Sequence, residues 1–239
     1  MAGTSVAANL LKLKSRIEAA CARSGRAPSS VHLLAVSKTQ PAALIEDALA
    51  FGQRDFAENY AQEALLKQDQ IAAARWHFIG RIQTNKVKLL ANRFVIIHSV
   101  DRFSVAHNLD NLTEGRPQDI FIQFNVAEEA TKGGAVELEL ENLVRGVSAC
   151  KNLRMLGLMV MPPLETDLEK ARRHFRTAKE ALKRLQPAIP QEERARHPFD
   201  QLSMGTSHDF EIAIEEGATW VRVGTDVFGA RENDEQELQ

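Results

Sequence analysis

The sequence has little of several features that would indicate a particular class of protein. Only two cysteines occur, Cys21 and Cys150. They form no metal or redox spacing, so we interpret them as core thiols of a cytoplasmic protein. No window approaches the roughly 18 consecutive apolar residues of a membrane span. The N-terminal stretch carries charges such as Lys12 and Lys14, so it lacks the apolar core of a signal peptide.

Charge and motif content exclude further classes. The 30 basic and 32 acidic residues give a formal net charge of -2, which offers no broad basic field to nucleic acid or to an anionic membrane. No cluster of His, Cys and carboxylate residues indicates a metal site. Neither a dinucleotide-binding glycine fingerprint nor a Walker loop is present. The 239 residues, of which 44% are hydrophobic, suit one large domain or two small ones.

Strand and helix patterns alternate along almost the whole chain. A helical spacing at residues 6–22 is followed by eight strand-like segments, at residues 31–37, 55–58, 76–79, 94–98, 120–126, 153–161, 201–204 and 220–223. Thr84 and Asp101 are expected to cap the helices after the third and fourth strands. The pattern and the length predict an α/β fold, a single (β/α)8 TIM barrel with an additional N-terminal helix. A doubly wound open sheet is the competing architecture.

No linker or repeat indicates a second domain, so we expect residues 1–239 to form one domain. The polar, acidic stretch at residues 232–239 is expected to be frayed.

Lys38 directly follows the first predicted strand, at the end where a barrel carries its chemistry. Side chains alternate along a strand, so Leu34, Val36 and Lys38 face the same way. In the last strand, placing the two valines against the helices turns Arg222 inward. The first and last strands of a closed barrel are neighbours, so Lys38 and Arg222 would converge at its mouth. The alternative is that Lys38 is an ordinary surface charge.

An amine at this position can form a Schiff base with an aldehyde, and an aldehyde that carries a phosphate also needs an anion site. Residues 204–207 lead from a strand to a helix start, where free N–H groups bind phosphate, and Gly224 and Thr225 form a turn after the last strand. Both segments could equally be a helix cap and a plain turn. Asn59 and His77 could face the same mouth or be satisfied structural groups.

Seven short stretches can be read together, at residues 35–39, 56–60, 76–80, 83–86, 157–159, 202–207 and 221–225. In this order and spacing they resemble the YggS/PROSC family of pyridoxal phosphate homeostasis proteins. The resemblance covers about residues 6–231. It implies a single-domain barrel similar to the N-terminal domain of bacterial alanine racemases.

The resemblance also implies a cofactor, pyridoxal 5'-phosphate (PLP), held as an internal aldimine on Lys38. The implied cofactor-binding residues are Lys38, Val36, Asn59, His77, Ser203, Ser207, Arg222, Gly224 and Thr225. The loop at residues 203–207 and the Gly224-Thr225 turn would bind the phosphate. Arg222 would face the pyridine nitrogen or reach toward the phosphate, and both readings stay open. No catalytic residue and no metal ligand is implied.

Three residues depart from the family pattern, namely Arg81, Thr206 and Asp226. The first two are expected to change only the rim of the pocket. A carboxylate that pointed at the phosphate turn would be unfavourable. Asp226 is therefore expected to face solvent or to pair with a basic group such as Arg231.

A cofactor on a lysine suggests an enzyme, but two features argue against one. Racemisation needs a second acid or base on the opposite face of the substrate carbon. Alanine racemases take it as a tyrosine from an additional β-domain, which this chain lacks, and Tyr60 is its only tyrosine. An arginine facing the pyridine nitrogen also disfavours protonation of the ring, which makes the ring a poorer electron sink.

The first hypothesis is therefore a monomeric, cytoplasmic PLP-binding protein in vitamin B6 homeostasis without robust catalysis, with apo PLP-enzymes as transient recipients. The alternatives are a low-activity PLP-dependent amino-acid racemase and a Schiff-base aldolase acting on a sugar phosphate.

Overall fold

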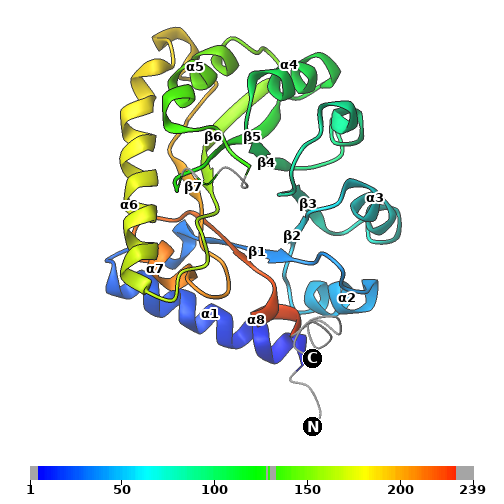
Figure 1. Cartoon of the computed structure of the whole chain (residues 1–239). Helices are drawn as coiled ribbons and strands as arrows, with labels where there is room; N and C mark the ends of the chain where they lie inside the picture. The colour runs from blue at the N-terminus through cyan, green and yellow to red at the C-terminus, as the bar shows by residue number, and fades with distance from the viewer. Residues whose placement is uncertain (1–4, 128, 130–132, 230–239) are drawn as a thin grey trace.

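The fold is a closed barrel of eight parallel strands that follow one another in sequence order (Figure 1). A computed structural model describes residues 5–127, 129 and 133–229. The predicted frayed tail at residues 232–239 and Arg231 lie outside the described residues. Strand β1 pairs with both β2 and β8, which closes the barrel. The predicted (β/α)8 barrel is confirmed, and the alternative of an open doubly wound sheet is wrong.

The strands lie close to the predicted segments. They are β1 (His32–Val36), β2 (Asp55–Glu58), β3 (Arg75–Phe78), β4 (Ile96–Val100), β5 (Gln118–Phe124), β6 (Leu153–Val160), β7 (Gln201–Ser203) and β8 (Trp220–Val223). The fourth strand begins two residues later than the sequence predicts, and the fifth begins two residues earlier.

The helices lie outside the barrel (Figure 1). The α-helices are α1 (Val6–Arg23), α2 (Ala42–Ala50), α3 (Ala61–Gln70), α4 (Phe103–Leu112), α5 (Glu137–Ser148), α6 (Leu168–Leu185), α7 (Phe210–Glu215) and α8 (Thr225–Phe228). The described residues also form four 3-10 segments: η1 (Pro28–Ser30), η2 (Thr84–Leu89), η3 (Gln186–Ala188) and η4 (Gln191–Glu193). The sequence analysis missed the short α8, which it read as part of a turn.

The segment after β3 differs from the prediction. It is the 3-10 segment η2 rather than an α-helix, and Thr84 does not cap it. The Thr84 hydroxyl instead accepts a hydrogen bond from Arg102 at 3.1 Å. The predicted Asp101 cap is also wrong, because the carboxylate of Asp101 is paired with Arg102 at 2.5 Å and α4 begins without a side-chain cap. Both side chains that were predicted to cap helices therefore bind the guanidinium of Arg102 instead.

Alternation along the strands separates two apolar layers. One cluster fills the barrel interior and consists of Leu34, Ala57, Ile96, Phe121, Leu156, Met159 and Trp220. The other lies between strands and helices and contains Ala35, Val221 and Val223 among many more. Neighbouring residues of β1 thus point to opposite layers, as a pleated strand requires. The predicted inward orientation of Arg222 is confirmed, since it is buried on the face opposite the two valines.

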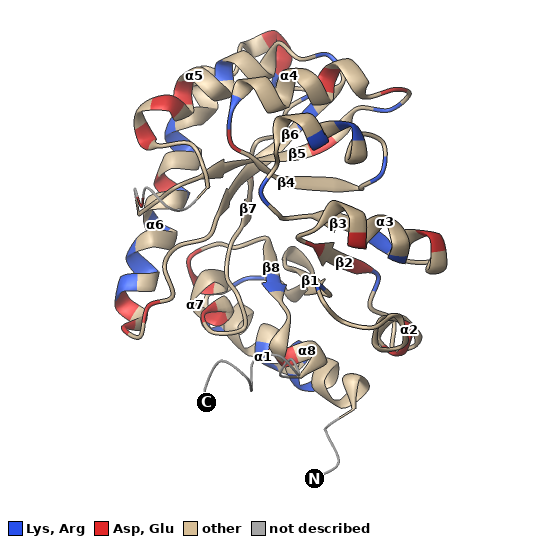
Figure 2. Cartoon of the chain, turned by 45° about the vertical axis from the view of Figure 1, so that its right-hand side comes forward, with Lys and Arg blue, Asp and Glu red and all other residues tan. Residues whose placement is uncertain are grey.

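Charged side chains lie mainly on the outer helices, while most strand residues are uncharged (Figure 2). None of the helices in the described part of the chain has the length and apolar character that a membrane crossing requires.

Helix α1 packs against α7 and α8. Arg16 of α1 pairs with Glu211 at 2.8 Å and with Asp226 at 2.6 Å. Asp226 therefore meets a basic group, as expected, but that group is Arg16.

Candidate functional site

Lys38 lies two residues beyond the end of β1, at the mouth formed by the carboxyl ends of the strands. It is half-buried. The next residue, Thr39, has a φ of 63°, a left-handed conformation that β-branched residues rarely adopt. The backbone that carries Lys38 therefore turns in a strained way and needs support from its surroundings.

A buried ion-pair cluster supplies this support. Lys67 Nζ donates to the carbonyl of Ser37 at 2.7 Å, to Glu58 Oε1 at 2.8 Å and to Glu63 Oε1 at 2.7 Å. The Ser37 hydroxyl donates to the same oxygen of Glu58 at 2.7 Å. The Thr39 amide donates to Glu63 Oε1 at 2.7 Å. The residues on both sides of Lys38 are thus tied to one ammonium group of α3 and its two carboxylate partners.

The cluster lies on the outer side of β2, and its central carboxylate is fully buried. Burial raises the pKa of Glu58, and the Lys67 ammonium opposes that effect. Glu58 Oε2 has no hydrogen-bond partner in the described residues. Glu58 therefore depends on Lys67 for compensation of its charge.

Arg222 lies across from Leu34 of the neighbouring strand β1 and is only 4% exposed. Its Nη1 donates to Ser203 Oγ at 3.0 Å and its Nη2 to the carbonyl of Val160 at 2.8 Å. Burial lowers the pKa of Arg222 to about 10, against the opposing charge of Asp209, so the guanidinium stays cationic at neutral pH. In the described residues no carboxylate accepts a hydrogen bond from it. A buried cation with unused donors is suited to an additional acceptor or anion.

Ser203 and His77 are committed to partners inside the barrel. Ser203 Oγ lies 2.9 Å from His98 Nδ1. His98 Nε2 lies 3.1 Å from His77 Nδ1, and His77 Nε2 lies 3.1 Å from Asp55 Oδ1. Both imidazoles are fully buried. His77 therefore contacts Asp55 and His98 inside the barrel and is linked to the mouth only through His98 and Ser203. The sequence analysis had considered that His77 itself could face the mouth.

The loop after β7 is folded so that backbone donors remain available. Gly205 has a φ of 92°, and a Cβ there would lie 2.6 Å from the Cβ of Ala213. Thr206 donates its amide to Asp209 Oδ1 at 2.6 Å. The amide groups of Ser207 and the following residue have no acceptor among the described residues. These amides can accept an anion as a partner.

The end of β8 lies close against the end of β1. A Cβ on Gly224 would lie 3.3 Å from the carbonyl oxygen of Val36, so glycine allows the close approach of the two strands. Thr225 follows as the exposed first residue of α8. The two predicted phosphate segments thus follow β7 and β8, which are neighbours in the barrel.

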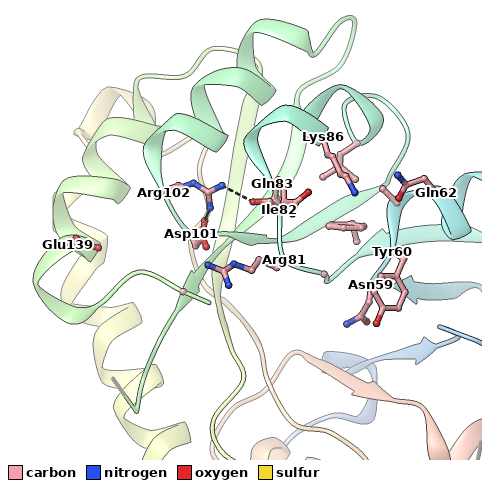
Figure 3. Close-up of a pocket in the computed structure, with 15 residues that line it drawn as sticks. Asn59, Tyr60, Gln62, Arg81, Ile82, Gln83, Lys86, Asp101, Arg102 and Glu139 are labelled. Carbon is pink, nitrogen blue, oxygen red and sulfur yellow. Dashed lines mark hydrogen bonds and ion pairs between the residues drawn. The ribbon is translucent and has the colours of Figure 1, made fainter. Parts of the chain in front are cut away.

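A cavity of about 950 Å³ opens beside this mouth (Figure 3). Asn59 and Tyr60 line it from the end of β2, and Arg81 and Lys86 from the segment after β3. Asn59 Oδ1 is buried without a hydrogen-bond partner in the described residues. Lys38 and Arg222 do not line this cavity. Of the predicted site residues, Asn59 is therefore the one that lines the cavity.

The residues that the sequence analysis missed are Glu58, Glu63, Lys67, His98 and Asp55. The spacing of Glu63 and Lys67, four residues apart on a helix, was a readable signal for an ion pair. His98 stood in a predicted apolar strand and carried no such signal. No group of three or more His, Cys, Asp or Glu residues suited to a metal ion occurs in the described part of the chain.

Comparison with known proteins assigns the family. The family model for the N-terminal domain of alanine racemase matches residues 8–232. A pyridoxal phosphate homeostasis protein of Pseudomonas aeruginosa is 44% identical over 235 residues, which cover 96% of this chain and 97% of that relative. The protein of the same name from Escherichia coli K12 is 38% identical, with 95% and 97% covered. The chain belongs to this family.

Solved structures agree with the assignment to the homeostasis family. PipY of Synechococcus elongatus, solved without PLP, is 34% identical with a TM-score of 0.83, covering 94% of this chain and 100% of PipY. PipY with PLP bound gives a TM-score of 0.81. Alanine racemase of Corynebacterium glutamicum is 14% identical with a TM-score of 0.70, covering 95% of this chain and 60% of the racemase. That last likeness is one of fold alone.

Proposed function

We propose that this protein binds PLP at the mouth of its barrel, holds it through a Schiff base on Lys38, and serves intracellular PLP homeostasis without robust catalysis. The observation that carries the proposal is the buried Arg222 guanidinium. It remains cationic, has neutral partners and unused donors, and lies on the strand next to that of Lys38.

The residues around the mouth fit the three chemical parts of PLP. The amine of Lys38 suits the aldehyde, and Arg222 suits an unprotonated pyridine nitrogen, which accepts a hydrogen bond. The available amides after β7, with Ser207, Gly224 and Thr225, suit the phosphate. Val36 and Asn59 would line the edge of the bound ring. PLP-bound PipY supports the proposal, as do the names of the relatives.

The chemistry that PLP supplies is an aldehyde that condenses with amines. Lys38 would supply the amine for this condensation, which would release the carbonyl oxygen as water. The chain contributes the orientation of that amine, through the ion pairs that hold Ser37 and Thr39. Arg222 contributes a positive charge that disfavours protonation of the ring nitrogen. A ring without that proton withdraws electrons weakly, which limits chemistry at a substrate carbon.

One observation favours the alternative of a low-activity amino-acid racemase. Tyr60, the only tyrosine of the sequence, is 58% exposed and lines the cavity beside the mouth (Figure 3). A tyrosine near the reacting carbon could act as the second acid or base. We nevertheless favour a carrier, because a largely solvated phenol lacks the desolvated setting that tunes catalytic groups. The proposal further includes a monomeric protein that transfers PLP to apo-enzymes.

Titration of the purified protein with PLP, followed by visible absorbance, tests the proposal. We expect a Schiff-base band in the wild type and its loss in Lys38→Ala, whereas Lys12→Ala, an exposed lysine on α1, should bind as the wild type does. Arg222→Gln should shift the band or weaken binding. An unchanged spectrum in Lys38→Ala would refute the role of Lys38.

A second measurement separates carrier from enzyme. Wild type and Tyr60→Phe are loaded with PLP and incubated with alanine or serine. Turnover that depends on Tyr60 would favour the racemase. Transfer of PLP to an apo-enzyme without turnover would favour the carrier.

A further inference from the structure

A continuous hydrogen-bond chain crosses the barrel interior from one end to the other. It begins at Arg222 near the mouth, passes through Ser203, His98 and His77, and ends at Asp55, the first residue of β2. Its successive lengths are 3.0, 2.9, 3.1 and 3.1 Å. Four different strands besides β8 contribute one group each, so the chain is not a local feature of any one element.

The surroundings of the two imidazoles keep them uncharged. The His98 ring stacks on Phe121, with ring centres 4.7 Å apart, and Trp220 packs against both imidazoles. Burial lowers the pKa of both His77 and His98 below the ordinary value of 6.5.

The charged and titratable groups around the chain stand at its ends. Arg222 faces His98, while Asp55, Arg75 and His32 surround His77. Arg75 pairs with Asp55 at 2.5 Å.

The ionised end fixes the direction of every bond. Hydrogen bonds from His77 and Arg75 keep the pKa of Asp55 low despite its burial, so the carboxylate accepts and His77 Nε2 carries the proton. A neutral imidazole has one donor and one acceptor, so His77 Nδ1 must accept from His98 Nε2. His98 Nδ1 is then bare and must accept from the Ser203 hydroxyl. That hydroxyl, with its proton spent, presents a lone pair to Arg222.

We propose that His98 and His77 are positioning residues for Arg222, because their fixed tautomers oblige Ser203 to accept from the guanidinium and so aim it at the ligand. The cofactor part of this inference rests on the proposed function. In metal and catalytic sites, a second group often hydrogen-bonds to a histidine and so fixes its orientation. Here the hydrogen-bond chain fixes the orientation of an arginine in the same way. A carboxylate at the opposite end of the barrel thereby determines which atoms of Arg222 are left for PLP.

The proton positions can be tested on the protein without PLP. Nitrogen-15 NMR of histidine-labelled protein distinguishes the two neutral tautomers from the cation. We expect the imidazoles of His77 and His98 to carry their proton on Nε2 at pH 7, with His77→Gln and His98→Gln identifying the signals. A proton on Nδ1 of either ring, or a charged ring at this pH, would overturn the chain as described.

The coupling to PLP is tested by a double-mutant cycle. His98→Gln and Ser203→Ala should each weaken PLP binding by about five-fold, the value of one hydrogen bond. Because both act through the same link, the double variant should lose about five-fold as well, whereas independent effects would multiply to about 25-fold. His107→Gln, the same change on the exposed face of α4, should bind PLP as the wild type does.

The outcomes separate this inference from the proposed function. If the wild type binds no PLP, the proposed function fails, and the NMR measurement of the histidine tautomers still tests the hydrogen-bond chain. If the wild type binds PLP but the two changes multiply, the positioning role fails alone. Should His98→Gln not fold, His77→Gln takes its place in the cycle, since it removes the imidazole that fixes the proton on His98. Multiplicative losses there would count against the proposal in the same way.

Discussion

Beneath Lys38 three charged side chains meet, whereas behind Arg222 two neutral imidazoles and a hydroxyl form a chain. The Lys67 cluster lies outside the barrel, under α3, and fastens backbone on both sides of Lys38. The histidine chain lies inside the barrel and fastens a side chain. The mouth is thus supported by ion pairs outside the barrel and by a hydrogen-bond chain inside it.

The difference follows from where each assembly lies. Glu63 of the Lys67 cluster is 27% exposed in its side chain, so the cluster retains some contact with solvent. The barrel interior offers no contact with solvent, and burying an uncharged polar group there costs less free energy than burying a charged one. Charge therefore appears at the two ends of the histidine chain, on Asp55 and Arg222. The Lys67 cluster should accordingly be sensitive to loss of one partner, and the histidine chain to pH.

Breaking the Lys67 cluster should give the largest effect. Lys67→Met removes the compensating charge from the fully buried Glu58, and breaking a buried pair costs about 3–5 kcal/mol. Urea denaturation should show a loss of this size. Lys12→Met, which changes an exposed lysine of α1, is the matched control and should change the unfolding free energy by less than about 0.5 kcal/mol.

The double variant Lys67→Met, Glu58→Leu sharpens the test. If the cost comes from an uncompensated carboxylate, removing that carboxylate should restore much of the lost stability. A double variant that is less stable than Lys67→Met would show instead that packing, and not charge, dominates at this position.

Much of the barrel could be read from the sequence because its signals are periodic. Alternating apolar residues gave eight strands and the inward side of Arg222, which the structure confirms. The errors fell where one side chain decides the local structure. The segment after β3 is a 3-10 segment, and Arg102 binds the side chains of both Thr84 and Asp101, which were predicted to cap helices. Caps depend on competition between partners that lie apart in sequence.

The assemblies behind the site could not be predicted for the same reason. His77 and His98 are 21 residues apart, and His98 and Ser203 are 105 apart. Only the closed barrel brings them together, and no spacing rule links such positions. The place of an individual residue such as Lys38 at the mouth could, by contrast, be predicted, because its position after a strand is local in the sequence and a barrel carries its chemistry at the carboxyl ends of its strands.

The second effect concerns pH and belongs to the histidine chain. Burial lowers the pKa of His77 and His98 from the ordinary value of 6.5. Their contribution to stability is therefore present above pH 6.5 and is lost as the pH falls through their folded-state pKa values. Each can contribute a slope of up to about 1.4 kcal/mol per pH unit. Unfolding free energies measured between pH 7.5 and 5 should fall with acidity.

His98→Gln should remove one proton's worth of this slope, and the exposed His107→Gln should remove none. Buried His197, whose pKa is also lowered by burial, keeps its own contribution in both variants. Glu58 acts in the opposite sense, since its raised pKa makes protonation easier in the folded state. An acid slope that His98→Gln leaves intact would place the sensitivity outside the chain.

The smallest effect lies at Ser207, which belongs to neither assembly. Neither its amide nor its hydroxyl has a hydrogen-bond partner in the described residues, so removing the hydroxyl breaks no described hydrogen bond of the fold. Ser207→Ala should leave the unfolding free energy of the protein unchanged and weaken PLP binding by about 1 kcal/mol, or about five-fold, the net value of one hydrogen bond. Pyridoxal, which lacks the phosphate, serves as the control ligand, and its affinity should not change. Equal losses of affinity for both ligands would show that Ser207 does not bind the phosphate. A lower unfolding free energy would show that the Ser207 side chain stabilises this loop, as the Lys67 cluster and the histidine chain stabilise the surroundings of Lys38 and Arg222.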